Sequence, residues 1–173
     1  YEIMPSLVGS EMCIRDSQIT EGHAIANHSL SHNFNLLYPG RVPNQSQITT
    51  EVDQTMANFK AILGKDFKTR IFRYPGGHMS WQGLEGTDQA LAKQGVQWID
   101  WNMLCGDAEP LSVRPTTSES MMAYMDGSQK YFPETTVKVV LMHDTAGKEL
   151  TVQTLPQIIE YFKNQGYTFG VLE

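Results

Sequence analysis

The sequence has few cysteines, no long apolar run and no excess of positive charge. Its two cysteines among 173 residues, Cys13 and Cys105, fit no zinc-ribbon spacing, and we interpret them as unrelated free thiols. No run of about 18 apolar residues occurs, so we expect no membrane-spanning helix. The formal charge of −6, from 13 basic and 19 acidic residues, argues against a general nucleic-acid or anionic-membrane binder.

The composition is that of a globular protein with one sizeable core. Hydrophobic residues make up 40% of the chain and charged residues 18%, and no low-complexity tract appears. Residues 1–17 show neither a period of 2 nor one of 3.6, so we expect them to be a non-native or unstructured leader. We expect residues 18–173 to form a single domain that acts as a monomer.

Helical and extended patterns alternate from residue 18 onward. The sequence predicts helices over 47–63, 87–93, 118–131 and 155–164, and strands over 22–26, 70–74, 96–101, 136–142 and 167–172. This alternation predicts an α/β fold with a parallel sheet or barrel. The strands of such a fold end on one rim, where we expect the polar residues that follow them: His28, His32, Arg73, Trp101, Asp107 and His143.

The spacing of His28 and His32 is that of a metal-binding pair. Imidazoles four residues apart can face one way on a helical turn and bind one divalent ion. The pair alone is a modest signal, and two unrelated histidines are the alternative. It does not match the H-E-x-x-H pattern of metalloproteases, because no glutamate follows the first histidine.

The sequence around this pair resembles a motif of a known family. The run from Gly22 to His32, GHAIANHSLSH, resembles the second motif of the NodB-type polysaccharide deacetylases (carbohydrate esterase family 4). Three further motifs of that family follow in order: the run 73–77, RYPGG; Trp101 with Asp107 six residues later; and the run 141–143, LMH. The resemblance covers residues 18–173 and implies a distorted (β/α) barrel. Within that family, the sequence most resembles bacterial peptidoglycan N-acetylglucosamine deacetylases.

The resemblance implies a metal site beside an oxyanion site. His28 and His32 would bind a divalent metal, Zn²⁺ first, with Co²⁺ or Ni²⁺ as alternatives. Gly76 would offer its backbone N–H to the developing oxyanion. Arg73 would orient a carboxylate base.

It also implies a general acid beside an acetyl pocket. His143 would protonate the departing amine, and Asp107 would pair with His143 and keep it protonated, with Asp100 as the rival carboxylate. Trp101 and Leu141 would form the wall of the pocket for the acetyl methyl group.

The function that this resemblance implies is removal of acetyl groups from an N-acetylglucosamine-containing polysaccharide in the bacterial cell envelope or outside the cell. Preference for N-acetyl or O-acetyl groups stays open. The family's T-F-D-D-G motif, which supplies the catalytic base and a third ligand, does not occur here. We therefore expect a domain without its first strand and helix. One alternative is a catalytically inactive carbohydrate-binding module, and another is a different metal hydrolase with Asp107, Glu109 or Asp144 as the further ligand.

Overall fold

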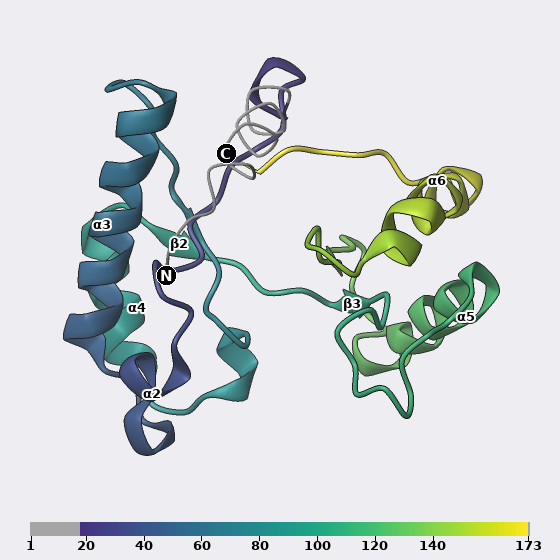
Figure 1. Cartoon of the computed structure of the whole chain (residues 1–173), viewed down its shortest axis with the longest axis horizontal. Helices are drawn as coiled ribbons and strands as arrows, with labels where there is room; N and C mark the ends of the chain where they lie inside the picture. Colours follow the sequence, from purple (N-terminus) through teal and green to yellow (C-terminus); the bar gives the residue numbers. More distant parts are fainter. Residues whose placement is uncertain (1–17, 173) are drawn as a thin grey trace. The chain divides into compact units, whose positions relative to one another are not determined.

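The computed structural model describes residues 18–172, which fold into two compact units (Figure 1). Unit 1 comprises residues 18–100 and 170–172, and unit 2 comprises Trp101–Phe169. The expected leader, residues 1–17, lies outside the described residues, and the expectation of a single domain over 18–173 stays a prediction.

Unit 1 combines a parallel strand pair with two packed helices. Its elements are α2 (Phe34–Leu37), η1 (Pro39–Arg41), α3 (Gln45–Leu63), β1 (Ile71–Phe72), η2 (His78–Ser80), α4 (Glu85–Lys93) and β2 (Gln97–Trp98). β1 and β2 are parallel, and Asn27 adds a parallel bridge to Phe72. Helix α3 packs against α4 (Figure 1). The core of this unit is Leu37, Tyr38, Ile48, Val52, Phe72, Tyr74, Leu84, Leu91 and Val96.

Helix α3 has the ends that its sequence predicts. The Asn44 side chain accepts a hydrogen bond from the backbone N–H of Gln47, which satisfies one of the unpaired donors of the first turn. Gly64, with a φ of 102°, follows the last helical residue, a conformation that glycine adopts without steric cost. The predicted helix over 47–63 is therefore confirmed, with two more residues at its start.

Unit 2 repeats the combination of parallel strands and helices. Its elements are β3 (Met103–Leu104), α5 (Ser118–Ser128), η3 (Gln129–Tyr131), β4 (Val140–Leu141) and α6 (Glu149–Asn164). β3 and β4 are parallel. Thr117 and Ser120 form a capping box at the start of α5, and α5 packs against α6 (Figure 1). The buried core comprises Met103, Cys105, Met121, Met125, Ile158 and Phe162.

Helix α6 begins six residues earlier than the sequence predicts. Pro156 lies inside the helix, where it removes a backbone donor at a cost of about 3 kcal/mol. The buried positions Thr151, Thr154, Ile158 and Phe162 follow helical spacing across the proline. Because burial of this face stabilises the helix on both sides of Pro156, the helix continues through the proline, and the predicted start at residue 155 is wrong.

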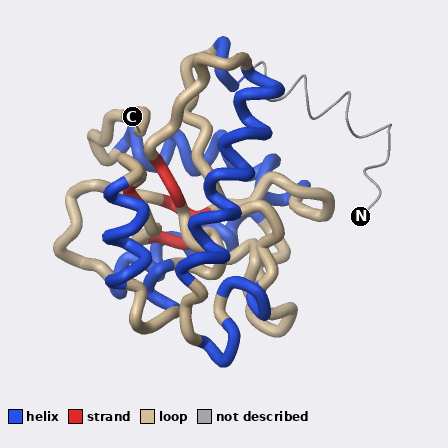
Figure 2. The backbone as a smooth tube through the Cα atoms, turned by 90° about the vertical axis from the view of Figure 1, so that its left-hand side faces the viewer, coloured by secondary structure: helices blue, strands red, loops and turns tan. Residues whose placement is uncertain are grey.

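The strands are shorter and fewer than predicted (Figure 2). Among the described residues, the four strands have two residues each, and neither 22–26 nor 167–172 is a strand. Residues 22–26 are largely exposed, and only Asn27 after them pairs with β1. β3 was not predicted. No helix of residues 18–172 is long and apolar enough to cross a membrane.

Gly106, between β3 and Asp107, is a position that only glycine fits. Its φ is 82°, and a Cβ atom there would lie 2.8 Å from Cδ1 of Tyr124 and 3.0 Å from Cδ of Pro115. We therefore expect Gly106→Ala to lower the free energy of unfolding by about 1–3 kcal/mol, measured by urea denaturation. Gly127→Ala is the matched control, because nothing lies within 4 Å of its Cβ position in α5. That substitution should raise stability by about 0.5–1 kcal/mol. Equal midpoints for Gly106→Ala and the parent chain would contradict this steric requirement.

Candidate functional site

Parallel strand pairing brings His28 beside Arg73 in unit 1. The backbone N–H of Asn27 donates to the Ile71 carbonyl, and that of Arg73 donates to the Asn27 carbonyl, both at 2.9 Å. One residue further on, Nδ1 of His28 donates to the Arg73 carbonyl at 2.7 Å. A carbonyl oxygen can only accept, so Nδ1 carries the proton and Nε2 of the neutral ring carries the lone pair. Metal-binding histidines in proteins are oriented in this way.

His32 lies next to His28, but not on a helical turn. The two ring centroids are 5.0 Å apart and the ring planes meet at 69°. Ser29 and His32 have φ values of 66° and 50°, in the left-handed region that non-glycine residues rarely adopt, so the predicted helical turn is wrong. Such residues cost about 1 kcal/mol or more each and gather at functional sites. This loop geometry places the two imidazoles side by side, and their role as metal ligands stays a prediction.

The carboxylate of Glu51 holds the loop that carries both histidines. Glu51 lies in α3 and is 2% exposed. It accepts the backbone N–H of Leu30 at 3.0 Å, the backbone N–H of Ser31 at 2.9 Å and the Ser31 hydroxyl at 2.7 Å. The Gln47 amide donates a fourth bond at 3.0 Å. Burial by itself would raise the pKa of Glu51, but these donors outweigh burial, so the pKa of Glu51 is lowered and the side chain stays a carboxylate.

Sequence reasoning did not select Glu51, although a signal was present. Ile48, Val52 and Thr55 form the buried face of α3, and Glu51 lies on that same face. A carboxylate on the buried face of a helix requires hydrogen-bond donors from another segment. The sequence therefore indicated that some loop donates to Glu51, but not which loop.

Arg73 and Asp100 lie at the ends of the neighbouring strands. Arg73 is half-buried, and its Nε is buried without a hydrogen-bond partner among residues 18–172. Burial lowers the pKa of Arg73, and the negative charge of Asp100 opposes that shift. The Asp100 carboxylate accepts the backbone N–H groups of His78 and Met79, both at 3.0 Å. The buried Nε fits the expected task of Arg73, which is to orient a carboxylate, and that task stays a prediction.

Gly76 follows Arg73 in a tight turn that brings aromatic rings close to the backbone. Its φ is 79°, and a Cβ atom there would lie 3.2 Å from Cζ2 of Trp81 and 3.3 Å from Cζ of Phe34. Both the conformation and the space therefore favour glycine. The residue is exposed, as the expected role of its N–H requires.

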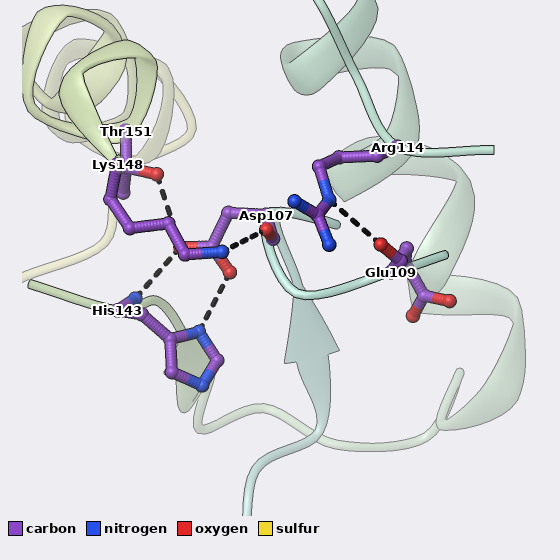
Figure 3. A network of polar contacts seen from close by, with 6 residues as sticks. All are labelled: Asp107, Glu109, Arg114, His143, Lys148 and Thr151. Atoms are coloured by element: carbon purple, nitrogen blue, oxygen red, sulfur yellow. Dashed lines mark hydrogen bonds and ion pairs between the residues drawn. The ribbon is translucent and has the colours of Figure 1, made fainter. Parts of the chain in front are cut away.

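In unit 2, Asp107 and His143 form a hydrogen-bonded pair at the ends of two parallel strands (Figure 3). Nδ1 of His143 lies 2.8 Å from Oδ1 of Asp107, and the backbone N–H of His143 donates to Oδ2 at 2.8 Å. In Figure 3 the other ring nitrogen points away from the carboxylate. The structure thus pairs His143 with Asp107, whereas the rival carboxylate, Asp100, binds backbone N–H groups of η2.

The Asp107 carboxylate is almost fully enclosed. It is 4% exposed, and Oδ2 also accepts the hydroxyl of Thr151 from α6 at 3.0 Å. The ammonium of Lys148 donates to the Asp107 backbone carbonyl (Figure 3). Burial alone would raise the pKa of Asp107, but the bonds from His143 and Thr151 outweigh it, so the pKa of Asp107 is lowered. A charged carboxylate in this position orients the imidazole through its hydrogen bond to Nδ1.

In the described part of unit 1, the residues expected to bind a metal are two imidazoles, those of His28 and His32. Among residues 18–172, no group of three or more His, Cys, Asp or Glu side chains could hold a metal ion. Asp107, weighed as a further ligand, has its oxygens occupied by His143 and Thr151. Trp101 and Leu141 are half-buried, and their place in an acetyl pocket stays a prediction.

Comparisons with known proteins place these motifs in one family. A profile described as "Polysaccharide deacetylase" matches residues 10–98, just over half of the chain. A solved structure of a carbohydrate esterase family 4 (CE4) esterase from Streptococcus mutans is 56% identical, with a TM-score of 0.91 over 94% of this chain and 68% of that chain. The catalytic domain of the peptidoglycan N-acetylglucosamine deacetylase from Eubacterium rectale is 26% identical, with a TM-score of 0.73 over 95% of this chain and 72% of that one.

A peptidoglycan-N-acetylglucosamine deacetylase from Bacillus cereus is 27% identical over 150 residues, which is 86% of this chain. The chain spans 50% of the length of that relative. The structural likenesses confirm the predicted fold class, the distorted (β/α) barrel type of NodB deacetylases, of which the described residues form a part.

The position of Glu51 leads to a test of the histidine loop. Glu51→Gln replaces an oxygen acceptor by an NH₂ group, which leaves buried donors unpaired. We expect the free energy of unfolding at pH 7 to fall by about 1–3 kcal/mol, and Zn²⁺ affinity, measured by chelator competition, to fall about tenfold or more. Asp53→Asn is the control, because Asp53 is exposed on the same helix. Unchanged Zn²⁺ affinity in a less stable Glu51→Gln chain would show that Glu51 does not position the histidines.

The stability difference between the parent chain and Glu51→Gln should depend on pH in a defined direction. Because the pKa of Glu51 is lower in the folded chain than its ordinary value of 4.5, its contribution to stability is complete above that value. The contribution is lost as the pH falls through the lowered folded value. We expect the stability difference between the parent chain and Glu51→Gln to shrink below pH 4.5, in urea titrations at several pH values.

Proposed function

Because the chain belongs to the polysaccharide deacetylase family, we propose that it is a metal-dependent hydrolase that removes acetyl groups from an N-acetylglucosamine-containing polysaccharide, peptidoglycan or a chitin-like polymer. The family match and the relatives named as peptidoglycan N-acetylglucosamine deacetylases support this substrate class. All three relatives are bacterial, which supports a place in the bacterial cell envelope or outside the cell.

The observation that carries the proposal is the hydrogen bond from Nδ1 of His28 to the Arg73 carbonyl. It selects the tautomer with the lone pair on Nε2, and the ring of His32 lies 5.0 Å away. An arrangement of two neighbouring imidazoles, one oriented by a carbonyl, fits a metal site better than it fits a pair of packing residues.

His28 and His32 would be protein ligands of the metal, with Zn²⁺ as the first choice and Co²⁺ or Ni²⁺ as alternatives. When bound, such an ion polarises an acetyl carbonyl and acidifies a water molecule. Gly76 would donate its backbone N–H to the oxygen that becomes negative during attack, and its missing side chain allows close approach. Arg73 would orient a carboxylate base through its guanidinium group.

His143 would donate the proton that the leaving amine needs. Asp107 accepts a hydrogen bond from Nδ1–H of His143, so a proton on Nε2 would be the one available for transfer. The buried carboxylate holds the ring in the orientation that this transfer needs. Trp101 and Leu141 would contact the acetyl methyl group.

The metal ligands can be tested by binding alone. We expect His28→Ala and His32→Ala each to lower Zn²⁺ affinity by tenfold or more, because each removes one ligand of a small set. His23→Ala is the matched control, since His23 lies in the same segment with its side chain 63% exposed. Zn²⁺ affinity is measured by isothermal titration calorimetry, and equal affinities of all three variants would contradict the assignment.

The reaction can be tested by release of acetate. We expect a version of the domain that carries the family's T-F-D-D-G motif, supplied with Zn²⁺ or Co²⁺, to release acetate from an N-acetylglucosamine tetramer or from peptidoglycan, and His143→Ala in that version to slow this by about 10²–10⁴-fold. His23→Ala should keep the parent rate. Binding of the tetramer without acetate release would favour the alternative, a catalytically inactive carbohydrate-binding module on the same fold.

A further inference from the structure

We propose that Phe34 is a sugar-binding residue whose aromatic ring contacts a pyranose ring of the polysaccharide. This inference rests on the proposed function for its substrate class, and it adds a residue that no motif of the sequence selected. Phe34 is the first residue of the short helix α2 and directly follows the loop of His28 and His32.

The Phe34 ring lies next to both groups expected to act on the acetyl group. Its centroid is 5.2 Å from that of the His32 ring, with the planes tilted by 35°. On another side, its Cζ lies 3.3 Å from the position where a Cβ of Gly76 would be. A substrate that reaches both His32 and the Gly76 backbone therefore passes beside Phe34.

Neighbouring rings hold Phe34 in place. It makes an edge contact with Trp81, at a centroid distance of 5.4 Å and an angle of 74°, and another with Tyr38 at 6.2 Å. Trp81 is itself fixed, because it stacks on the buried Tyr38 at 3.8 Å and donates its indole N–H to the Pro75 carbonyl at 2.9 Å. Phe34 thus loses little side-chain freedom when a ligand binds.

Phe34 nevertheless keeps 43% of its surface exposed. A single exposed apolar residue is common, and Leu36 in the same helix is 48% exposed. Phe34 differs from Leu36 because it contacts His32 and is fixed by two further rings. The C–H faces of a pyranose ring are apolar and carry partial positive charge, which matches the negative face of an aromatic ring.

The test is binding of an N-acetylglucosamine tetramer to the full chain, measured by saturation-transfer NMR and calorimetry. We expect Phe34→Ala to weaken binding about tenfold, which is the fold-change for loss of one aromatic contact. Phe34→Trp should keep the parent affinity. Leu36→Ala is the control for loss of an exposed apolar side chain and should bind as the parent does.

Two further readouts distinguish a sugar contact from damage to the fold or to the metal site. Thermal unfolding and Zn²⁺ affinity of Phe34→Ala should match the parent, because the ring is assigned to the sugar and not to the histidine loop. Parent-like tetramer binding by Phe34→Ala would overturn the inference, and so would equal losses of tetramer binding and Zn²⁺ affinity.

Failure of the proposed function gives a different result. Phe34-dependent binding of the tetramer without acetate release, even when the T-F-D-D-G motif is present, would refute the hydrolase and support the sugar contact. A parent chain that binds neither the tetramer nor a peptidoglycan fragment would overturn the sugar contact itself.

Discussion

Parallel pairing of short strands determines which polar residues meet in each unit. In unit 1, the backbone bonds between Asn27 and β1 align two segments far apart in the sequence, so that His28 reaches the Arg73 carbonyl. In unit 2, β3 and β4 bring Asp107 to His143 in the same way. Since the strands have two residues each, the side chains at their ends depend on little regular sheet structure. Additional hydrogen bonds must therefore hold them.

Two buried carboxylates supply much of that additional order. Glu51 accepts four hydrogen bonds and holds the histidine loop in unit 1, and Asp107 binds both the backbone and the imidazole of His143 in unit 2. Burial makes a charged group costly, and only several donors can compensate for that cost. The lowered pKa of both groups indicates that they do. Loop conformations with positive φ, such as that of His32, persist because such contacts hold them.

Local patterns predicted the helices better than the strands. The apolar spacing of α3 and its flanking Asn44 and Gly64 are short-range signals, and that prediction is confirmed. Strand pairing depends on partners distant in the chain, so residues 22–26 had an extended pattern without forming a strand, and β3 was missed. The predicted start of α6 at residue 155 is wrong, because burial of the face on both sides of Pro156 outweighs the local cost of the proline.

Sequence alone determined the family, the α/β class and a set of candidate residues, because motifs in a fixed order can be recognised without any knowledge of their contacts. Tertiary structure decided how those residues are arranged. His28 and His32 meet through a loop with positive φ values, Asp107 rather than Asp100 pairs with His143, and Glu51 and Phe34 join the surroundings of the histidines. The reason is physical: spacing along a chain limits which residues can share a local turn, whereas hydrogen bonds and ring contacts between distant segments exist only once the chain has folded.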